Sequence, residues 1–212
     1  MCGIFSIINN NNITDEICNN FEKLQDRGPE YTNIIVENDH TFGFHRLSIN
    51  GINSKSNQPF NIDNIILICN GEIYNFKNLI NDLKIQTYTD SDCEVIIHLY
   101  KLYGIEHTLR CLDGVFSFIL YDKNNSVIYV ARDPYGVRPL FFYHGYDDKI
   151  YFSSNLKGIY NFYKKDVKLL KYTHNTIPTF NKVHQFEPGT FSEYKMNYDI
   201  NKYNIKYNKR YS

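Results

Sequence analysis

Short apolar segments separated by polar turns run through most of this 212-residue sequence, and they constrain the fold more than any other feature. Residues 65–69 are apolar without interruption, which is typical of a strand buried on both faces. From residue 114 onward, apolar segments follow one another at short intervals and predict strands. The predicted strands cover residues 2–8, 33–37, 41–49, 65–69, 115–121, 127–131, 140–144, 150–153 and 190–194.

Helices are predicted mainly in the first half of the chain. Ser91 and Glu94 have the spacing of a capping box, and apolar residues follow them on one helical face. Gly28 and Pro29 stop an earlier helix. The predicted helices cover residues 14–25, 76–83, 91–103 and 105–111. Strands, then helices, then further strands predict an α+β fold, with antiparallel sheets and helices outside them.

The composition argues against several classes of function. The formal net charge is +0, so no basic field exists to collect phosphates, and nucleic acid is not an expected partner. No segment approaches the roughly 20 apolar residues of a membrane span, and the first residues lack a signal-peptide pattern. The five cysteines are scattered, without a C-x-x-C pair or zinc-ligand spacing, as in a reduced protein. We therefore expect a cytoplasmic protein with no membrane contact and no metal site.

Cys2 directly follows the initiator methionine. Aminopeptidases remove methionine before small residues, so Cys2 is expected to carry a free α-amine beside its thiol. An α-amine has a reference pKa of about 7.7–8.0, so its neutral form can take the thiol proton without a separate histidine. Gly3 lets backbone and substrate approach closely. The competing interpretation is an accidental, buried cysteine, which position alone does not exclude.

Asn70, Gly71 and Glu72 follow the apolar run at residues 65–69. The Asn70 side-chain amide and the Gly71 backbone N–H are suited to bind a developing oxyanion, and one such donor is worth about 3–4 kcal/mol. A simple Asn-Gly turn is the alternative. That alternative does not account for the buried strand that leads into the turn.

Three charged residues match the charges of a free amino acid. Arg46 lies in an otherwise apolar predicted strand, where it needs a carboxylate partner, either internal or on a substrate. Asp92 lies in the first turn of a predicted helix, where it also complements the helix dipole. With Glu72, these residues offer one cation to an α-carboxylate and two anions to an α-ammonium group.

Residues 132–139 read Arg-Asp-Pro-Tyr-Gly-Val-Arg-Pro and connect two predicted strands. The segment lacks the glycine spacing and the lysine of a P-loop, which disfavours phosphate binding. A rigid, ion-paired structural turn is predicted instead.

Seven segments, taken in chain order, resemble a single family: MCGIF, DRGPE, FGFHRLSI, CNGEIYN, SDCEVI, LDGVFSF and ARDPYGVRPLFF. The family is the glutaminase domain of glutamine-hydrolysing asparagine synthetase. It is a class II glutamine amidotransferase domain of the N-terminal-nucleophile hydrolase superfamily. The resemblance covers residues 2–195 and leaves residues 196–212 as a polar C-terminal tail. It implies a four-layer αββα sandwich of two antiparallel sheets.

The resemblance also implies a role for each candidate residue. Cys2 is the nucleophile, and Asn70 and Gly71 form the oxyanion hole. Arg46 holds the α-carboxylate of glutamine, while two carboxylates hold its α-amino group. The carboxylates are those of Glu72 and Asp92, and the residues implied to bind glutamine are Arg46, Leu47, Ser48, Ile49, Asn50, Asn70, Gly71, Glu72 and Asp92.

The implied reaction is hydrolysis of L-glutamine to glutamate and ammonia through a thioester on Cys2, with no metal and no nucleotide. ATP and magnesium enter only through a synthetase domain, whose pyrophosphate-loop pattern is absent from this sequence. Candidate partners are a separately encoded ATP-dependent synthetase subunit and a second copy of the chain in a homodimer. Two alternatives stay open: a catalytically weak glutamine-binding or partner-docking module, and an amidotransferase domain that feeds a different acceptor.

Overall fold

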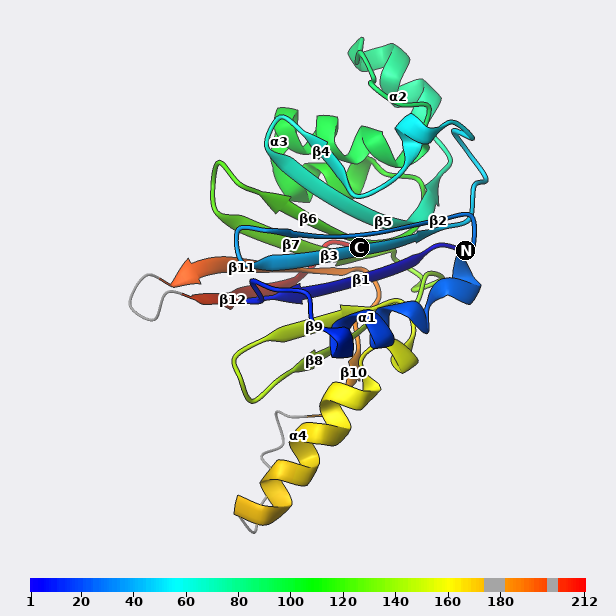
Figure 1. Cartoon of the computed structure of the whole chain (residues 1–212). Coiled ribbons are helices and arrows are strands. Elements are labelled where there is room, and N and C mark those ends of the chain that lie inside the picture. The colour runs from blue at the N-terminus through cyan, green and yellow to red at the C-terminus, as the bar shows by residue number, and fades with distance from the viewer. Residues whose placement is uncertain (174–181, 198–201) are drawn as a thin grey trace.

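Two antiparallel sheets of six strands each pack face to face in the computed structural model, which describes residues 1–173, 182–197 and 202–212 (Figure 1). Sheet A has the strand order β10 (His184–Gln185), β8 (Phe141–His144), β9 (Ile150–Ser153), β1 (Gly3–Ile8), β3 (His40–Arg46) and β2 (Tyr31–Glu37). Sheet B has the order β12 (Lys202–Arg210), β11 (Thr190–Asn197), β7 (Val127–Arg132), β6 (Gly114–Asp122), β5 (Ile65–Ile73) and β4 (Phe60–Ile62).

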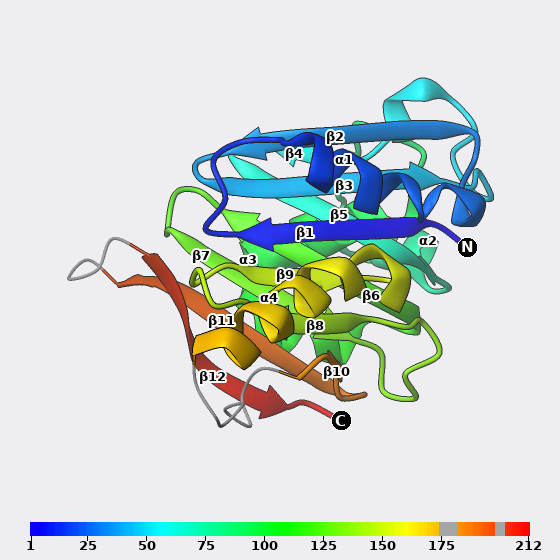
Figure 2. The same ribbon diagram turned by 60° about the horizontal axis from the view of Figure 1, so that its bottom comes forward.

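Helices cover the outer faces of both sheets. On the sheet B side lie α2 (Phe76–Leu83) and α3 (Val95–Cys111), and on the sheet A side lie α1 (Asp15–Glu22) and α4 (Tyr160–Thr173) (Figures 1 and 2). Short 3₁₀ turns, η1 to η4, occur at Gln25–Arg27, Ser54–Ser56, Asp92–Glu94 and Leu156–Gly158. The predicted α+β class and the four-layer αββα arrangement are therefore confirmed.

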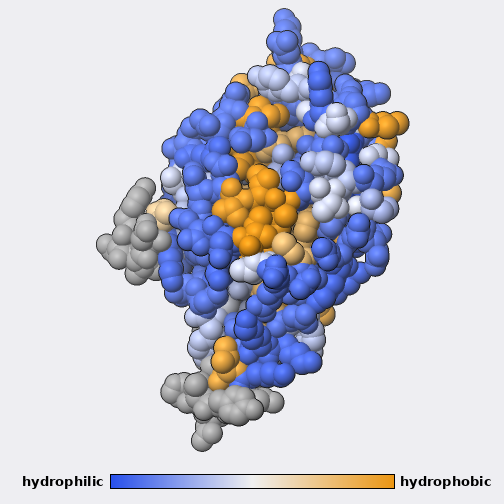
Figure 3. Space-filling model, viewed as in Figure 1, coloured by the Kyte–Doolittle hydropathy of each residue, from blue (hydrophilic) through white to orange (hydrophobic). Residues whose placement is uncertain are grey.

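Alternating side chains sort the apolar residues into three cores. On β5, Ile66 and Ile68 face sheet A, whereas Leu67 and Cys69 face the helices on the other side. A third cluster lies between sheet A and the helices α1 and α4. Hydrophilic side chains cover much of the face seen in Figure 3, with the largest group of apolar side chains at its middle and smaller groups toward its edges. No described helix is long and apolar enough to cross a membrane.

The predicted helix at residues 91–103 begins differently from a capping box. The Ser91 side chain accepts a hydrogen bond from the Cys93 N–H, as expected at an N-cap. The Glu94 carboxylate, however, accepts from the backbone N–H groups of Tyr88 and Thr89. The reason is that the chain before the helix folds over Glu94 and buries it completely. Gly104, at φ 75°, then separates the two predicted helical pieces, which α3 joins across a kink.

The prediction of a polar tail at residues 196–212 is wrong where the structure describes it. Residues 202–210 form β12, which pairs with β11 along the edge of sheet B. Tyr203 on this strand is buried beside the Tyr121 ring. Edge strands commonly carry lysine and other polar residues, so this strand lacks the apolar pattern of a central one. Residues 198–201 of the predicted tail lie outside the described residues.

Candidate active site

On three strands, the row of apolar side chains that faces the other sheet ends in a polar residue. All three polar residues lie at the same end of the gap between the sheets. Each polar residue lies two positions from a buried apolar residue, so both side chains point to the same face of the strand. The pairs are Ile4 and Cys2 beside β1, Phe44 and Arg46 on β3, and Ile68 and Asn70 on β5. The alternation of β structure thereby brings residues far apart in the sequence to one cavity.

Cys2 lies at the rim of this cavity, immediately before β1. Its Sγ is 3.5 Å from the Leu47 nitrogen and 3.6 Å from the Leu47 oxygen, and its carbonyl accepts a 3.0 Å hydrogen bond from Arg27 Nε. Burial raises the pKa of the Cys2 thiol, so the thiol needs a base to become a nucleophile. A Cβ on Gly3 would lie 3.2 Å from the Leu24 oxygen, which leaves little room for a side chain there.

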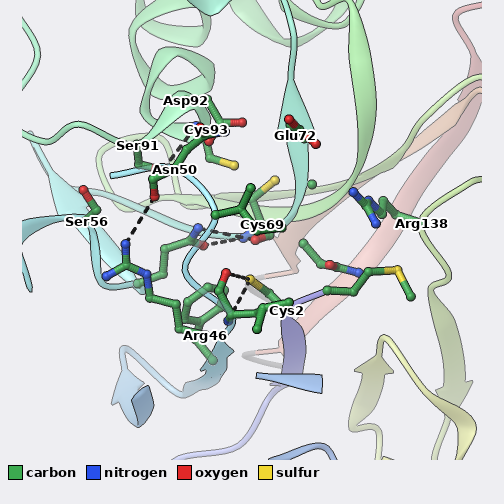
Figure 4. Close-up of a pocket in the computed structure, with 17 residues that line it drawn as sticks. Cys2, Arg46, Asn50, Ser56, Cys69, Glu72, Ser91, Asp92, Cys93 and Arg138 are labelled. Atoms are coloured by element: carbon green, nitrogen blue, oxygen red, sulfur yellow. Dashed lines mark hydrogen bonds between the residues drawn. The ribbon is translucent and has the colours of Figure 1, made fainter. Parts of the chain in front are cut away.

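The Asn70 amide is a buried donor without an acceptor. Asn70 is 1 % exposed, and its Nδ2 has no hydrogen-bond partner among the described residues. An unsatisfied buried donor costs about 1–3 kcal/mol, so such a group calls for an explanation. Figure 4 shows the cavity into which this region opens, with Cys2 below, Arg46 to the left, and Glu72 and Asp92 above.

The Gly71 backbone N–H points away from β6. Its neighbour across the ladder, Phe116, uses its own N–H and C=O on Asp133, so Gly71 and Phe116 exchange no hydrogen bonds. The Gly71 N–H therefore faces the other edge of β5, and none of the described residues accepts from it. A Cβ at Gly71 would lie 2.8 Å from the Phe116 Cβ, so sheet packing requires glycine here.

Arg46 makes contacts that neither sequence interpretation anticipated. Its Nη1 donates to the Asn53 oxygen at 3.0 Å and to the Asn57 side chain. Its Nη2 donates to the Asn50 oxygen at 3.3 Å and to the Gly51 oxygen. No carboxylate of the described chain forms an ion pair with it. In this conformation the loop 50–57 thus occupies both terminal nitrogens of the guanidinium.

Glu72 and Asp92 line the cavity opposite Cys2. Asp92 is 4 % exposed, and its Oδ2 accepts a 2.7 Å hydrogen bond from the Ile73 N–H. Burial, and to a lesser degree the neighbouring Glu72, raise the pKa of Asp92. A cation placed between the two carboxylates would favour the charged form of Asp92, which burial disfavours.

The cavity volume is about 40 Å³. Every residue that the sequence assigned to the site lines it except Ser48, whose N–H donates to Glu30 at 2.7 Å. The sequence analysis missed Met1, Phe44, Ser56, Gln58, Cys69, Ser91, Cys93 and Arg138, which also line it. Ser56 and Gln58 lie outside the segments that carry the family resemblance, whereas the other six lie within those segments but were assigned no role in the site.

Arg138 belongs to the segment 132–139, which the sequence analysis interpreted as a structural turn. A structural turn is present, but hydrogen bonds from the Asp133 and Arg132 side chains to backbone groups, not an ion pair among the described residues, hold it together. The Asp133 carboxylate accepts from the N–H groups of Tyr135, Val137 and Arg138, and Arg132 donates to surrounding carbonyl oxygens. The turn thereby places Arg138 at the cavity wall (Figure 4), close enough to the Met1 amine to lower its pKa.

Similarity to known proteins extends over most of the chain. A family described as "Glutamine amidotransferase domain" matches residues 1–206. A probable glutamine-hydrolysing asparagine synthetase of Acanthamoeba polyphaga mimivirus is 40% identical over 172 residues, covering 76% of this chain and 31% of that protein. The glutamine-hydrolysing asparagine synthetase of Gallus gallus is 37% identical over 197 residues, covering 90% of this chain and 33% of that protein. This chain thus spans about a third of the length of these relatives.

Among solved structures, the glutamine phosphoribosylpyrophosphate amidotransferase from B. subtilis has the same fold. The TM-score is 0.72 and the sequence identity 21%, and the match covers 100% of this chain and 49% of that one. At this level of identity, the similarity extends to the architecture and not to the acceptor chemistry of that protein.

Proposed function

Because this chain belongs to the glutamine amidotransferase domain family, we propose that it hydrolyses L-glutamine to glutamate and ammonia through a thioester on Cys2. The observation that carries the proposal is a pair of unpaired N–H donors beside the thiol. Asn70 and Gly71 line the same cavity as Cys2; the Asn70 Nδ2 lacks an acceptor among the described residues, and the strand register turns the Gly71 N–H away from β6. Buried N–H donors without acceptors are costly, and a role in binding the oxyanion of the reaction explains why they are present.

Removal of Met1 is the first requirement of this mechanism. With Met1 in place, the Cys2 nitrogen is an amide and cannot act as a base. The amine of Met1 already has a lowered pKa because it is partly buried and lies near Arg27 and Arg138. The amine released on Cys2 would lie near the same groups, so we expect its pKa to be lowered as well. It could then accept the thiol proton, which burial otherwise holds on sulfur.

The reaction then proceeds in two balanced steps. The Cys2 sulfur attacks the side-chain carbonyl carbon of glutamine, and Asn70 and Gly71 stabilise the oxyanion. When the tetrahedral intermediate collapses, the C–N bond breaks and the α-amine passes its proton to the departing nitrogen, which leaves as ammonia. Water attacks the thioester next, releasing glutamate and restoring the thiol. Neither step consumes a metal ion or a nucleotide.

Binding of the substrate α-carboxylate requires a change at Arg46. Glu72 and Asp92 would hold the α-ammonium group, and Arg46 the α-carboxylate. The loop 50–57 must first release the Arg46 guanidinium, since its oxygens occupy both terminal nitrogens. Loss of the Met1 side chain, which lines the cavity, would add to the present 40 Å³.

The destination of the ammonia is the second part of the proposal. The relatives are named as asparagine synthetases, and this chain matches about a third of their length. We therefore infer that it supplies ammonia to an ATP-dependent synthetase that makes asparagine in the cytoplasm. ATP and magnesium would be bound by that synthetase and not by the residues described here. An acceptor other than aspartate, or a binding module with weak turnover, are the alternatives.

Glutamate release from glutamine tests the proposal. Wild type and Cys2→Ala are assayed with and without a synthetase, after the intact mass has shown that Met1 is absent. We expect release by the wild type alone, and covalent labelling of the wild type by the glutamine analogue diazo-oxo-norleucine. Processed wild type that binds glutamine in calorimetry but releases no glutamate would instead identify a binding module.

A further inference from the structure

Gln58 is a buried residue of the cavity wall that the mechanism above does not use. It lies two residues before β4 and is 4 % exposed. Its Oε1 accepts a 2.6 Å hydrogen bond from the Cys69 N–H, and its Nε2 donates to the Cys69 oxygen at 3.3 Å. The side-chain amide therefore forms the same two bonds with Cys69 that a residue of a neighbouring strand would form.

These two bonds occur at a particular place on the edge of β5. Alternate residues of β5 direct their backbone N–H groups to this edge. The first two pair with β4, in the register Ile65 with Ile62 and Leu67 with Phe60. Beyond Phe60 the strand β4 ends, and Gln58 takes over at the next position, Cys69. The side chain thus extends the ladder by one step after the backbone has left the sheet.

The next N–H along the same edge is that of Gly71, and the one after it belongs to Ile73. The Ile73 N–H donates to Asp92 at 2.7 Å. The unpaired Gly71 N–H is consequently flanked on both sides by N–H groups that are bound to buried side chains. An unsupported strand edge can twist or shift, whereas this edge is held two residues before and two residues after the free donor.

We propose that Gln58 is a positioning residue for the oxyanion hole, which aims the Gly71 N–H by fixing the backbone at Cys69. The proposal rests on the proposed glutaminase function. Gln58 itself touches no reacting atom, because both ends of its amide are bound to Cys69. Its contribution would appear in the transition state, where the oxyanion forms, and not in the binding of glutamine.

A merely structural role for Gln58 makes a different prediction. If Gln58 only closes a strand edge, its loss should lower the melting temperature and leave the turnover of the folded enzyme unchanged. Asn75 provides a matched control, because its amide also binds one backbone oxygen and one backbone N–H, those of Cys111 and Asp113. Asn75 does not line the cavity.

The experiment compares wild type, Gln58→Met and Asn75→Ala as processed full chains. The measurements are kcat and KM for glutamine, inhibition by the glutamine-derived aldehyde glutamate γ-semialdehyde, and inhibition by glutamate. The aldehyde adds to the thiol and creates an oxyanion, whereas glutamate binds without one. Removal of an oxyanion donor lowers kcat by about 10²–10³-fold, and a displaced donor should lower it by about tenfold or more. If Gln58→Met fails to fold, Gln58→Glu serves as the test variant in its place, because its carboxylate keeps an acceptor for the Cys69 N–H.

Gln58→Met is expected to lose kcat and affinity for the aldehyde, with KM and glutamate inhibition changed less than threefold. Asn75→Ala should retain all four values. Equal kcat in Gln58→Met and Asn75→Ala, with an active wild type, would overturn the positioning role alone. A processed wild type that releases no glutamate would overturn the proposed function, and the role of Gln58 with it.

Discussion

Replacement of Asn70 by leucine is predicted to remove activity without removing stability. The Asn70 Nδ2 is buried and has no acceptor in the described structure, so the folded protein already bears its desolvation cost of about 1–3 kcal/mol. Leucine has a similar size and no donor, so the free energy of unfolding should stay level or rise. The transition state, in contrast, would lose a donor worth about 3–4 kcal/mol, equivalent to a 10²–10³-fold decrease in kcat.

The assay pairs glutamate release with thermal unfolding of the same preparations. Asn10→Leu is the matched control, because Asn10 is equally buried, at 1 % exposure, and lies beyond the opposite end of β1. Its Nδ2 donates to the Thr41 hydroxyl at 2.7 Å and to the Asn12 oxygen at 2.6 Å. Asn10→Leu should therefore lose stability by about 1–3 kcal/mol and keep its kcat. The reasoning is refuted if Asn70→Leu is destabilised as much as the control and retains its kcat within threefold.

Two further predictions concern stability alone. His40 is buried, and burial lowers its pKa from 6.5 to about 3. On acidification the unfolded chain therefore binds a proton at this histidine before the folded protein does. Between pH 6.5 and about 3, the free energy of unfolding should fall by up to about 1.4 kcal/mol for each pH unit. Urea unfolding at several pH values should show a shallower dependence in His40→Leu, and an unchanged slope would contradict this assignment. Tyr203→Ala should lower the free energy of unfolding by about 3 kcal/mol, because β12 buries this ring against His40 and Tyr121. A melting temperature equal to that of wild type would argue against β12 as part of the fold.

The sequence predicted those parts of the protein that depend on neighbouring residues. The continuous apolar run at residues 65–69 became the centre of β5, and the helix after Ser91 was confirmed although Glu94 bonds differently. The candidate residues were also recognisable, since thiol, amide and charge define their chemistry in any fold. By contrast, β12 was missed because an edge strand does not need an apolar face, and β4 because it has only three residues.

Only the tertiary structure decided how the candidate residues meet. Cys2, Arg46 and Asn70 come together because three inward-facing rows end at the same edge of the gap between the sheets. The free Gly71 N–H depends on where β4 stops and on Gln58, which no local pattern reveals. Local patterns depend on residues a few positions apart, whereas an unpaired donor depends on which distant strand is absent beside it. The sequence by itself thus determined the chemistry available, and the packing of two sheets determined which of those groups stay free to react.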